Sequence, residues 1–80
     1  MENKDSVLVV DDEMGPREAL RMILKGRYEI ITADSGERAL GHLAERVFDV
    51  VIVDIKMAGM DGLQLLRRIK EVKPDIEVIL

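Results

Sequence analysis

Two unbroken apolar runs that each end on acids constrain the fold of this chain more than any other feature. Residues 7–10 (VLVV) lead directly into Asp11 and Asp12. Residues 50–53 (VVIV) lead in the same way into Asp54. A run that is apolar throughout is typical of a strand buried on both faces, and such strands belong to parallel sheets covered by helices. The acids repel one another and resist burial, so we expect something at the strand ends to offset that cost.

Strand and helix patterns alternate along the chain. Strands are predicted at residues 6–10, 28–33, 50–53 and 76–80. The segments between them carry apolar residues at helical spacing, which we predict to be core: Ala19, Leu20, Ile23 and Leu24, then Ala39, Leu40, Leu43, Ala44 and Val47, then Leu65, Leu66, Ile69 and Val72. The capping candidates are Asp34 or Ser35 for the second helix and Asp61 for the third. The order β-α-β-α-β-α-β predicts an α/β fold with a doubly wound parallel sheet.

Composition excludes several classes of protein. The chain has 80 residues, which allows one domain, and its 48% hydrophobic and 35% charged content is typical of a globular chain. Twelve basic and 16 acidic residues give a net charge of −4 without a basic patch, so we expect no direct nucleic-acid binding. No apolar run approaches the ~18 residues of a membrane span. The polar N-terminus and the absence of Cys make a cytoplasmic location the default expectation.

The acids themselves indicate a chemistry. In open parallel sheets, ligands bind outside the carboxyl ends of the strands. Asp11, Asp12 and Asp54 all follow such ends, and they meet if the first and third strands are neighbours. Mg²⁺ prefers oxygen ligands and is commonly held by one or two carboxylates, waters and a phosphate oxygen. Asp is also a known nucleophile that forms an aspartyl-phosphate. The sequence therefore predicts a Mg²⁺ site beside a phosphoryl-accepting carboxylate.

The stretches VLVVDDE and VIVDIKMAGMDG, at this separation on this frame, resemble the receiver domain of bacterial two-component response regulators. The resemblance implies a flavodoxin-like (CheY-like) fold. It implies that Asp54 accepts a phosphoryl group from a sensor histidine kinase, from a phosphotransfer protein or from a small donor such as acetyl phosphate. Asp12 would bind Mg²⁺ directly, Asp11 mainly through water, and Lys56 through its backbone carbonyl. Such a module is a signalling switch rather than a turnover enzyme, and it acts on an output domain, here expected to be transcriptional.

The same resemblance assigns minor roles and exposes departures. Glu13 would line the rim of the site, Met57 would belong to the following loop, and Gly62 would permit a tight turn into the third helix. The family commonly has Pro where this chain has Ala58. The family also continues with a last strand and two helices, a switch Ser or Thr and a Lys. We therefore expect residues 1–80 to be the N-terminal part of a receiver domain, incomplete on one sheet face and at one edge, and prone to form homo-oligomers.

Alternatives remain open at this point. A non-phosphorylated interaction or dimerisation module could use the same fold. An Asp-nucleophile phosphohydrolase is disfavoured, because the segment after Asp54 reads IK and offers no second Asp two residues on. The acids could also be solvated helix caps. We expect Asp61 to be a cap rather than a metal ligand, and His42 to lie on a helix surface.

Overall fold

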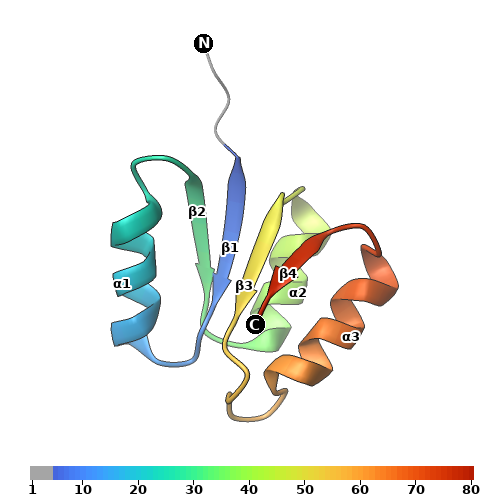
Figure 1. The fold of residues 1–80 in the computed structure, drawn as a ribbon. Coiled ribbons are helices and arrows are strands. Elements are labelled where there is room, and N and C mark those ends of the chain that lie inside the picture. The colour runs from blue at the N-terminus through green and yellow to red at the C-terminus, as the bar shows by residue number, and fades with distance from the viewer. Residues whose placement is uncertain (1–4) are drawn as a thin grey trace.

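The computed structural model describes residues 5–80, which form one parallel sheet and three helices (Figure 1). The strands lie in the order β2-β1-β3-β4 and all pair in parallel. Their bounds are Ser6–Val10 for β1, Glu29–Ala33 for β2, Val50–Val53 for β3 and Glu77–Ile79 for β4. The helices are α1 at Met14–Leu24, α2 at Gly36–Glu45 and α3 at Gly62–Val72. The predicted α/β class and element order are confirmed, although β2 and β4 are shorter than predicted.

One face of the sheet carries the main core. Side chains from β1 and β3 pack there against α2 and α3, and the most deeply buried members are Leu8, Val10, Val51, Val53, Ala39, Leu43, Leu65 and Ile69. Period-two alternation explains the strand members of this set, because every second strand residue points to the same face of the sheet. Phe48 and Met57 complete the cluster from the loops that follow α2 and β3. The core therefore lies directly beneath the strand ends that carry the acids.

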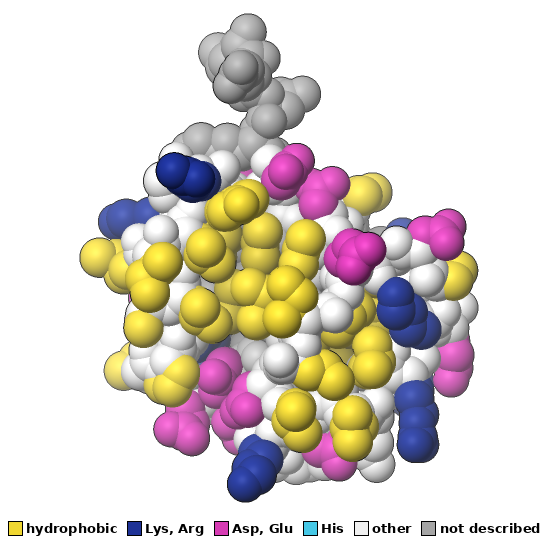
Figure 2. Space-filling view, in the orientation of Figure 1, with side chains coloured by type: hydrophobic (Ala, Val, Ile, Leu, Met, Phe, Trp, Pro, Cys, Tyr) yellow, Lys and Arg dark blue, Asp and Glu magenta, His cyan; other side chains and the backbone are white. Residues whose placement is uncertain are grey.

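The opposite face is only partly covered. We call it the open face, and it carries Val7, Val9, Val50, Ile52 and Ile79, the alternate residues of β1, β3 and β4. Helix α1 contacts β1 and β2 but leaves the rest of this face without a helix (Figure 1). Figure 2 shows apolar side chains gathered across it. Ile79 is accordingly 54% exposed although it pairs with Ile52.

The prediction that every aliphatic helix face is core is wrong for α1. No residue of α1 is buried, and Ile23 is 76% exposed. The cause is the position of the helix, since it lies over the β1–β2 side of the open face and has no neighbouring helix to pack against among residues 5–80. An amphipathic pattern identifies the apolar side of a helix but not whether a partner covers that side.

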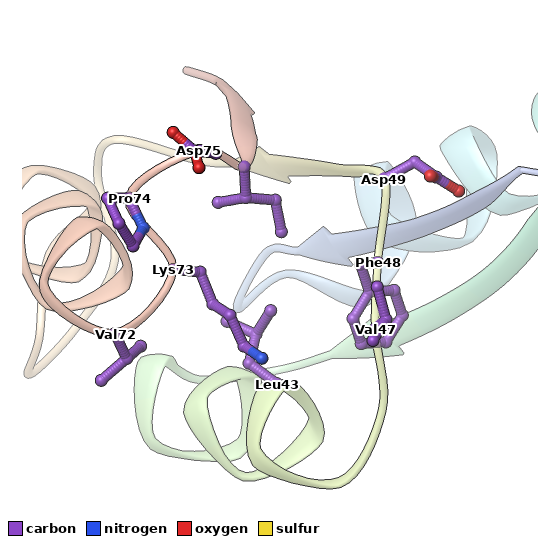
Figure 3. Close-up of a pocket in the computed structure, with 9 residues that line it drawn as sticks. Leu43, Val47, Phe48, Asp49, Val72, Lys73, Pro74 and Asp75 are labelled. Atoms are coloured by element: carbon purple, nitrogen blue, oxygen red, sulfur yellow. The ribbon is translucent and has the colours of Figure 1, made fainter.

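Three further predicted core residues are exposed, and one of them is Ala44 on α2. Val47 is 77% exposed because α2 ends at Glu45, and Val72 is 61% exposed at the last residue of α3. Both line a cleft of about 420 Å³ between the ends of α2 and α3, with Phe48 and Pro74 among the other residues that line it (Figure 3). Helical spacing identified the apolar side of each helix, but at Val47 and Val72 that side faces the cleft rather than the core.

Helix α3 begins with a capping box. The Asp61 carboxylate accepts the backbone N–H of Gln64 at 2.9 Å, and the Gln64 side chain accepts the backbone N–H of Asp61 at 3.3 Å. Ser35 caps α2 in a similar way through the N–H of Arg38. These caps fix where the loops after β2 and β3 end.

No helix among residues 5–80 has both the length and the apolar composition that a membrane-spanning helix needs.

Candidate functional site

Adjacent strands deliver the acids to one edge of the sheet. Val10 is paired with Val53, so the residues that follow β1 and β3 leave the sheet side by side. The backbone hydrogen bonds continue one residue further, because Asp11 N–H donates to Ala33 O at 3.1 Å and Asp54 N–H donates to Val10 O at 3.0 Å. The two acids are therefore anchored to the rigid sheet through their main chains, which leaves their side chains to define the site.

The three predicted carboxylates converge. One oxygen from each of Asp11, Asp12 and Asp54 lies within 4.8 Å of the others. In an octahedron with Mg–O bonds of about 2.0–2.1 Å, opposite ligand oxygens lie about 4.2 Å apart. The three oxygens are thus close enough for one cation to lie among them, bound directly or through a water. An all-carboxylate donor set is the chemistry that suits Mg²⁺ rather than a softer metal.

The three side chains differ in burial and in what holds them. Asp11 is only 8% exposed, and its Oδ1 accepts the N–H of Glu13 at 2.9 Å. Asp54 is half-buried, and its Oδ1 accepts the N–H of Lys56 at 3.2 Å. Asp54 Oδ2 makes no described hydrogen bond, so one oxygen remains free for chemistry. Asp12 is exposed and is therefore the most accessible carboxylate of the three.

The remaining predicted site residues lie near these acids with different roles. Lys56 follows Asp54 by two residues and has an exposed side chain, so its main chain is the part that faces the phosphoacceptor candidate. Glu13 is exposed at the start of α1, in keeping with a position on the rim. Met57 belongs to the loop, as predicted, but its side chain is 8% exposed and packs into the core. Asp61 caps α3, and His42 is half-buried on α2.

The structure shows why position 62 is a glycine, which the sequence did not reveal. We predicted that Gly62 permits a tight turn, yet the one glycine with positive φ among residues 5–80 is Gly59, at 73°. A Cβ on Gly62 would lie 2.6 Å from the carbonyl oxygen of Asp54 and 2.6 Å from Cα of Ile55. Gly62 is therefore required because α3 approaches the backbone of Asp54 and Ile55 too closely for a side chain.

Two groups at the site were missed by the sequence analysis. The guanidinium of Arg17 donates to the backbone carbonyl of Asp11 at 3.0 Å and so brings a cation beside the acids. Arg17 follows Asp11 by six residues, near the start of α1, and this spacing could have indicated the contact. The backbone N–H of Ala58 donates to Oδ2 of Asp12 at 3.0 Å. No side-chain pattern reveals such a backbone donor.

Comparison with known proteins gives a consistent answer. A model of the response regulator receiver domain matches residues 7–80. The transcriptional regulatory protein ZraR of Escherichia coli O157:H7 is 43% identical over 75 residues, which cover 92% of this chain. Those residues cover only 17% of ZraR, so the chain spans a small part of the curated relatives that it matches.

Solved structures agree with this family. The response regulator TrrA from Thermotoga maritima, in complex with Mg²⁺-BeF, has a TM-score of 0.90 and 43% identity, over 95% of this chain and 67% of TrrA. TrrA in complex with the histidine kinase ThkA has a TM-score of 0.86 and 41% identity, over 92% of this chain and 65% of that one. These sequence identities indicate common ancestry, which adds to the evidence from the strand order and the acid cluster. This chain belongs to the response regulator receiver domains, the phosphoacceptor signalling modules of two-component systems.

Proposed function

We propose that Asp54 is the phosphoacceptor of this receiver and that Asp11, Asp12, Asp54 and the backbone carbonyl of Lys56 hold Mg²⁺ beside it. The observation that carries the proposal is the convergence of three carboxylates within 4.8 Å at the ends of adjacent strands. Of the three acids, Asp54 combines a half-buried position, a fixed Oδ1 and a free Oδ2. That combination suits an in-line nucleophile, because one oxygen is oriented while the other can approach phosphorus.

The residues divide the work of phosphoryl transfer. Oδ2 of Asp54 forms the new bond to phosphorus, while the bond from phosphorus to the donor histidine nitrogen or acetyl oxygen breaks and its electrons leave with the donor. The Lys56 N–H holds Oδ1 and keeps the carboxylate in one orientation. Asp12 would bind the cation directly, and Asp11, which is buried, would bind it mainly through water. Mg²⁺, when bound, neutralises the charge of the acids and of the transferring group.

The partners follow from the family. We propose a sensor histidine kinase, or a phosphotransfer protein, as donor, supported by the complex of TrrA with a histidine kinase. We also propose that residues 1–80 are the N-terminal part of the receiver, that an output domain acting on transcription belongs to the same protein, and that the location is cytoplasmic. The similarity to a transcriptional regulatory protein, of which this chain covers 17%, supports the output proposal.

A test of the function uses intact mass after incubation with acetyl phosphate and Mg²⁺. We expect the chain to gain one phosphoryl group, and the gain to vanish in Asp54→Asn or when a chelator removes the metal. Asp49→Asn is the matched control, since Asp49 precedes β3 at the opposite end of the strand and its carboxylate binds the N–H of Ser6. Equal phosphorylation of the native chain and of Asp54→Asn would exclude Asp54 as the acceptor.

A second candidate, an interaction module, is supported by the open face. Its apolar residues Val50 and Ile52 on β3 are half-buried, and Ile79 on β4 is 54% exposed. Exposed apolar patches mark surfaces that associate. We propose that the 80-residue chain forms homo-oligomers through this face, whether or not Asp54 is phosphorylated.

A further inference from the structure

One hydrogen bond joins the two loops that carry the acids. The backbone N–H of Ala58 donates to Oδ2 of Asp12 at 3.0 Å, although the two residues are 46 positions apart. Asp12 belongs to the loop between β1 and α1, and Ala58 to the loop between β3 and α3. The contact therefore links the exposed acid of the first loop to the segment that follows Asp54.

The other two acids are oriented differently. The carboxylates of Asp11 and Asp54 each accept the N–H of the residue two positions further on, at 2.9 Å and 3.2 Å. These local hydrogen bonds orient the two carboxylates independently of the rest of the site. Asp12 has no such local partner, and the Ala58 N–H is the one hydrogen-bond donor that residues 5–80 provide to its carboxylate. Its orientation thus depends on the position of the distant loop.

The loop is built to keep that donor in place. At its base, Gly62 N–H donates to the carbonyl of Ile55 at 2.9 Å, and the Met57 side chain is anchored in the core. Gly59, with φ of 73°, reverses the chain immediately after Ala58. Any residue except Pro can supply the donor at position 58, because Pro has no backbone N–H. The family commonly has Pro here, so this contact belongs to the departure of this chain from the family pattern.

We propose that the Ala58 N–H is a positioning group that orients Asp12 for the divalent cation and couples the loop after Asp54 to occupancy of the metal site. The inference rests on the proposed function, because it assumes that Asp12 is a metal ligand. Hydrogen bonds that orient a metal-binding carboxylate contribute about 10–100-fold to metal affinity, and an exposed ligand belongs at the low end of that range. Loss of the Ala58 donor is therefore expected to weaken Mg²⁺ binding about tenfold.

The first experiment measures Mg²⁺ affinity by titration calorimetry for the native chain, Ala58→Pro and Ala58→Ser. Ser keeps the backbone N–H and Pro removes it, so the two variants differ in the group under test. We expect Ala58→Pro to bind about tenfold more weakly and Ala58→Ser to bind within about twofold of the native chain. Equal affinity of Ala58→Pro and the native chain would overturn the inference. No Mg²⁺ binding by the native chain would instead refute the proposed function.

The second experiment keeps the inference testable if Ala58→Pro does not fold. Amide hydrogen exchange is followed by NMR in the presence of a chelator, with the N–H of Gly59 as reference, since no described hydrogen bond involves it. We expect the Ala58 amide to exchange at least several-fold more slowly than that of Gly59, and Asp12→Ala to abolish the difference. An Ala58 amide that exchanges as fast in the native chain as in Asp12→Ala would show that the contact does not form.

Discussion

Replacement of Gly62 by Ala tests the packing of α3 against the segment that carries Asp54. The new Cβ would lie 2.6 Å from the Asp54 carbonyl oxygen, 2.6 Å from Cα of Ile55 and 3.1 Å from the Asp54 carbonyl carbon. All three are backbone atoms, so no side-chain rotation can relieve the overlap. Either α3 or the segment that carries Asp54 must move.

Two other glycines provide matched controls. A Cβ on Gly36, the first residue of α2, would lie 2.8 Å from Sδ of Met60, which is the far end of a flexible side chain. A Cβ on Gly41 would meet nothing within 4 Å. The three positions therefore compare contact with backbone, contact with a movable side chain and no contact at all.

The expected magnitudes follow from that comparison. Overpacking costs typically about 1–3 kcal/mol, and Ala in place of Gly returns at most about 1 kcal/mol of helix propensity. We expect the free energy of unfolding to fall by about 2 kcal/mol in Gly62→Ala and to change by less than about 1 kcal/mol in Gly36→Ala. In Gly41→Ala it should rise by about 0.5–1 kcal/mol.

The assay is urea unfolding of each variant at low protein concentration, followed by far-ultraviolet circular dichroism. The order of stability should be Gly41→Ala, then Gly36→Ala, then Gly62→Ala. If Gly62→Ala is as stable as Gly36→Ala, the close approach of α3 to the Asp54 segment does not restrict this position and the reasoning is wrong.

Three further predictions use other parts of the molecule. Mg²⁺ at a hundred times its dissociation constant should stabilise the fold by about 2.7 kcal/mol in thermal unfolding, and Asp12→Asn should lose most of that gain. Leu65→Ala, at a fully buried position, should cost about 2–5 kcal/mol in urea unfolding, whereas Leu63→Ala, at a side chain 50% exposed, should cost less than about 0.5 kcal/mol. Light scattering should show a mass that rises with concentration and falls towards the monomer in Ile79→Glu, and a monomer at every concentration would contradict association through the open face.

The parts of the fold that the sequence predicted well are those with strong local signals. The bounds of β1 and β3 match the prediction because both are all-apolar runs that end on acids. Asp61 was expected to cap a helix, and it forms a capping box there. The convergence of Asp11, Asp12 and Asp54 also followed, because carboxyl ends of neighbouring parallel strands must share one edge of the sheet.

The parts that escaped prediction depend on tertiary contacts. The pattern of α1 is amphipathic, but the exposure of Ile23 depends on what lies beside the helix. The role of Gly62 depends on how closely α3 approaches Asp54, a distance that no sequence pattern encodes. The Ala58 donor is a backbone group, which every residue type except Pro carries, so nothing in the sequence distinguishes it.

The most direct test of the account is to locate the phosphoryl group. The chain is incubated with acetyl phosphate and Mg²⁺, the acyl phosphate is reduced with borohydride, and peptides are sequenced by mass spectrometry. We expect one modified residue, Asp54, and no modification without Mg²⁺. Modification at Asp11 or Asp12 instead, or modification of Asp54 that is independent of the metal, would contradict the assignment of acceptor and ligands.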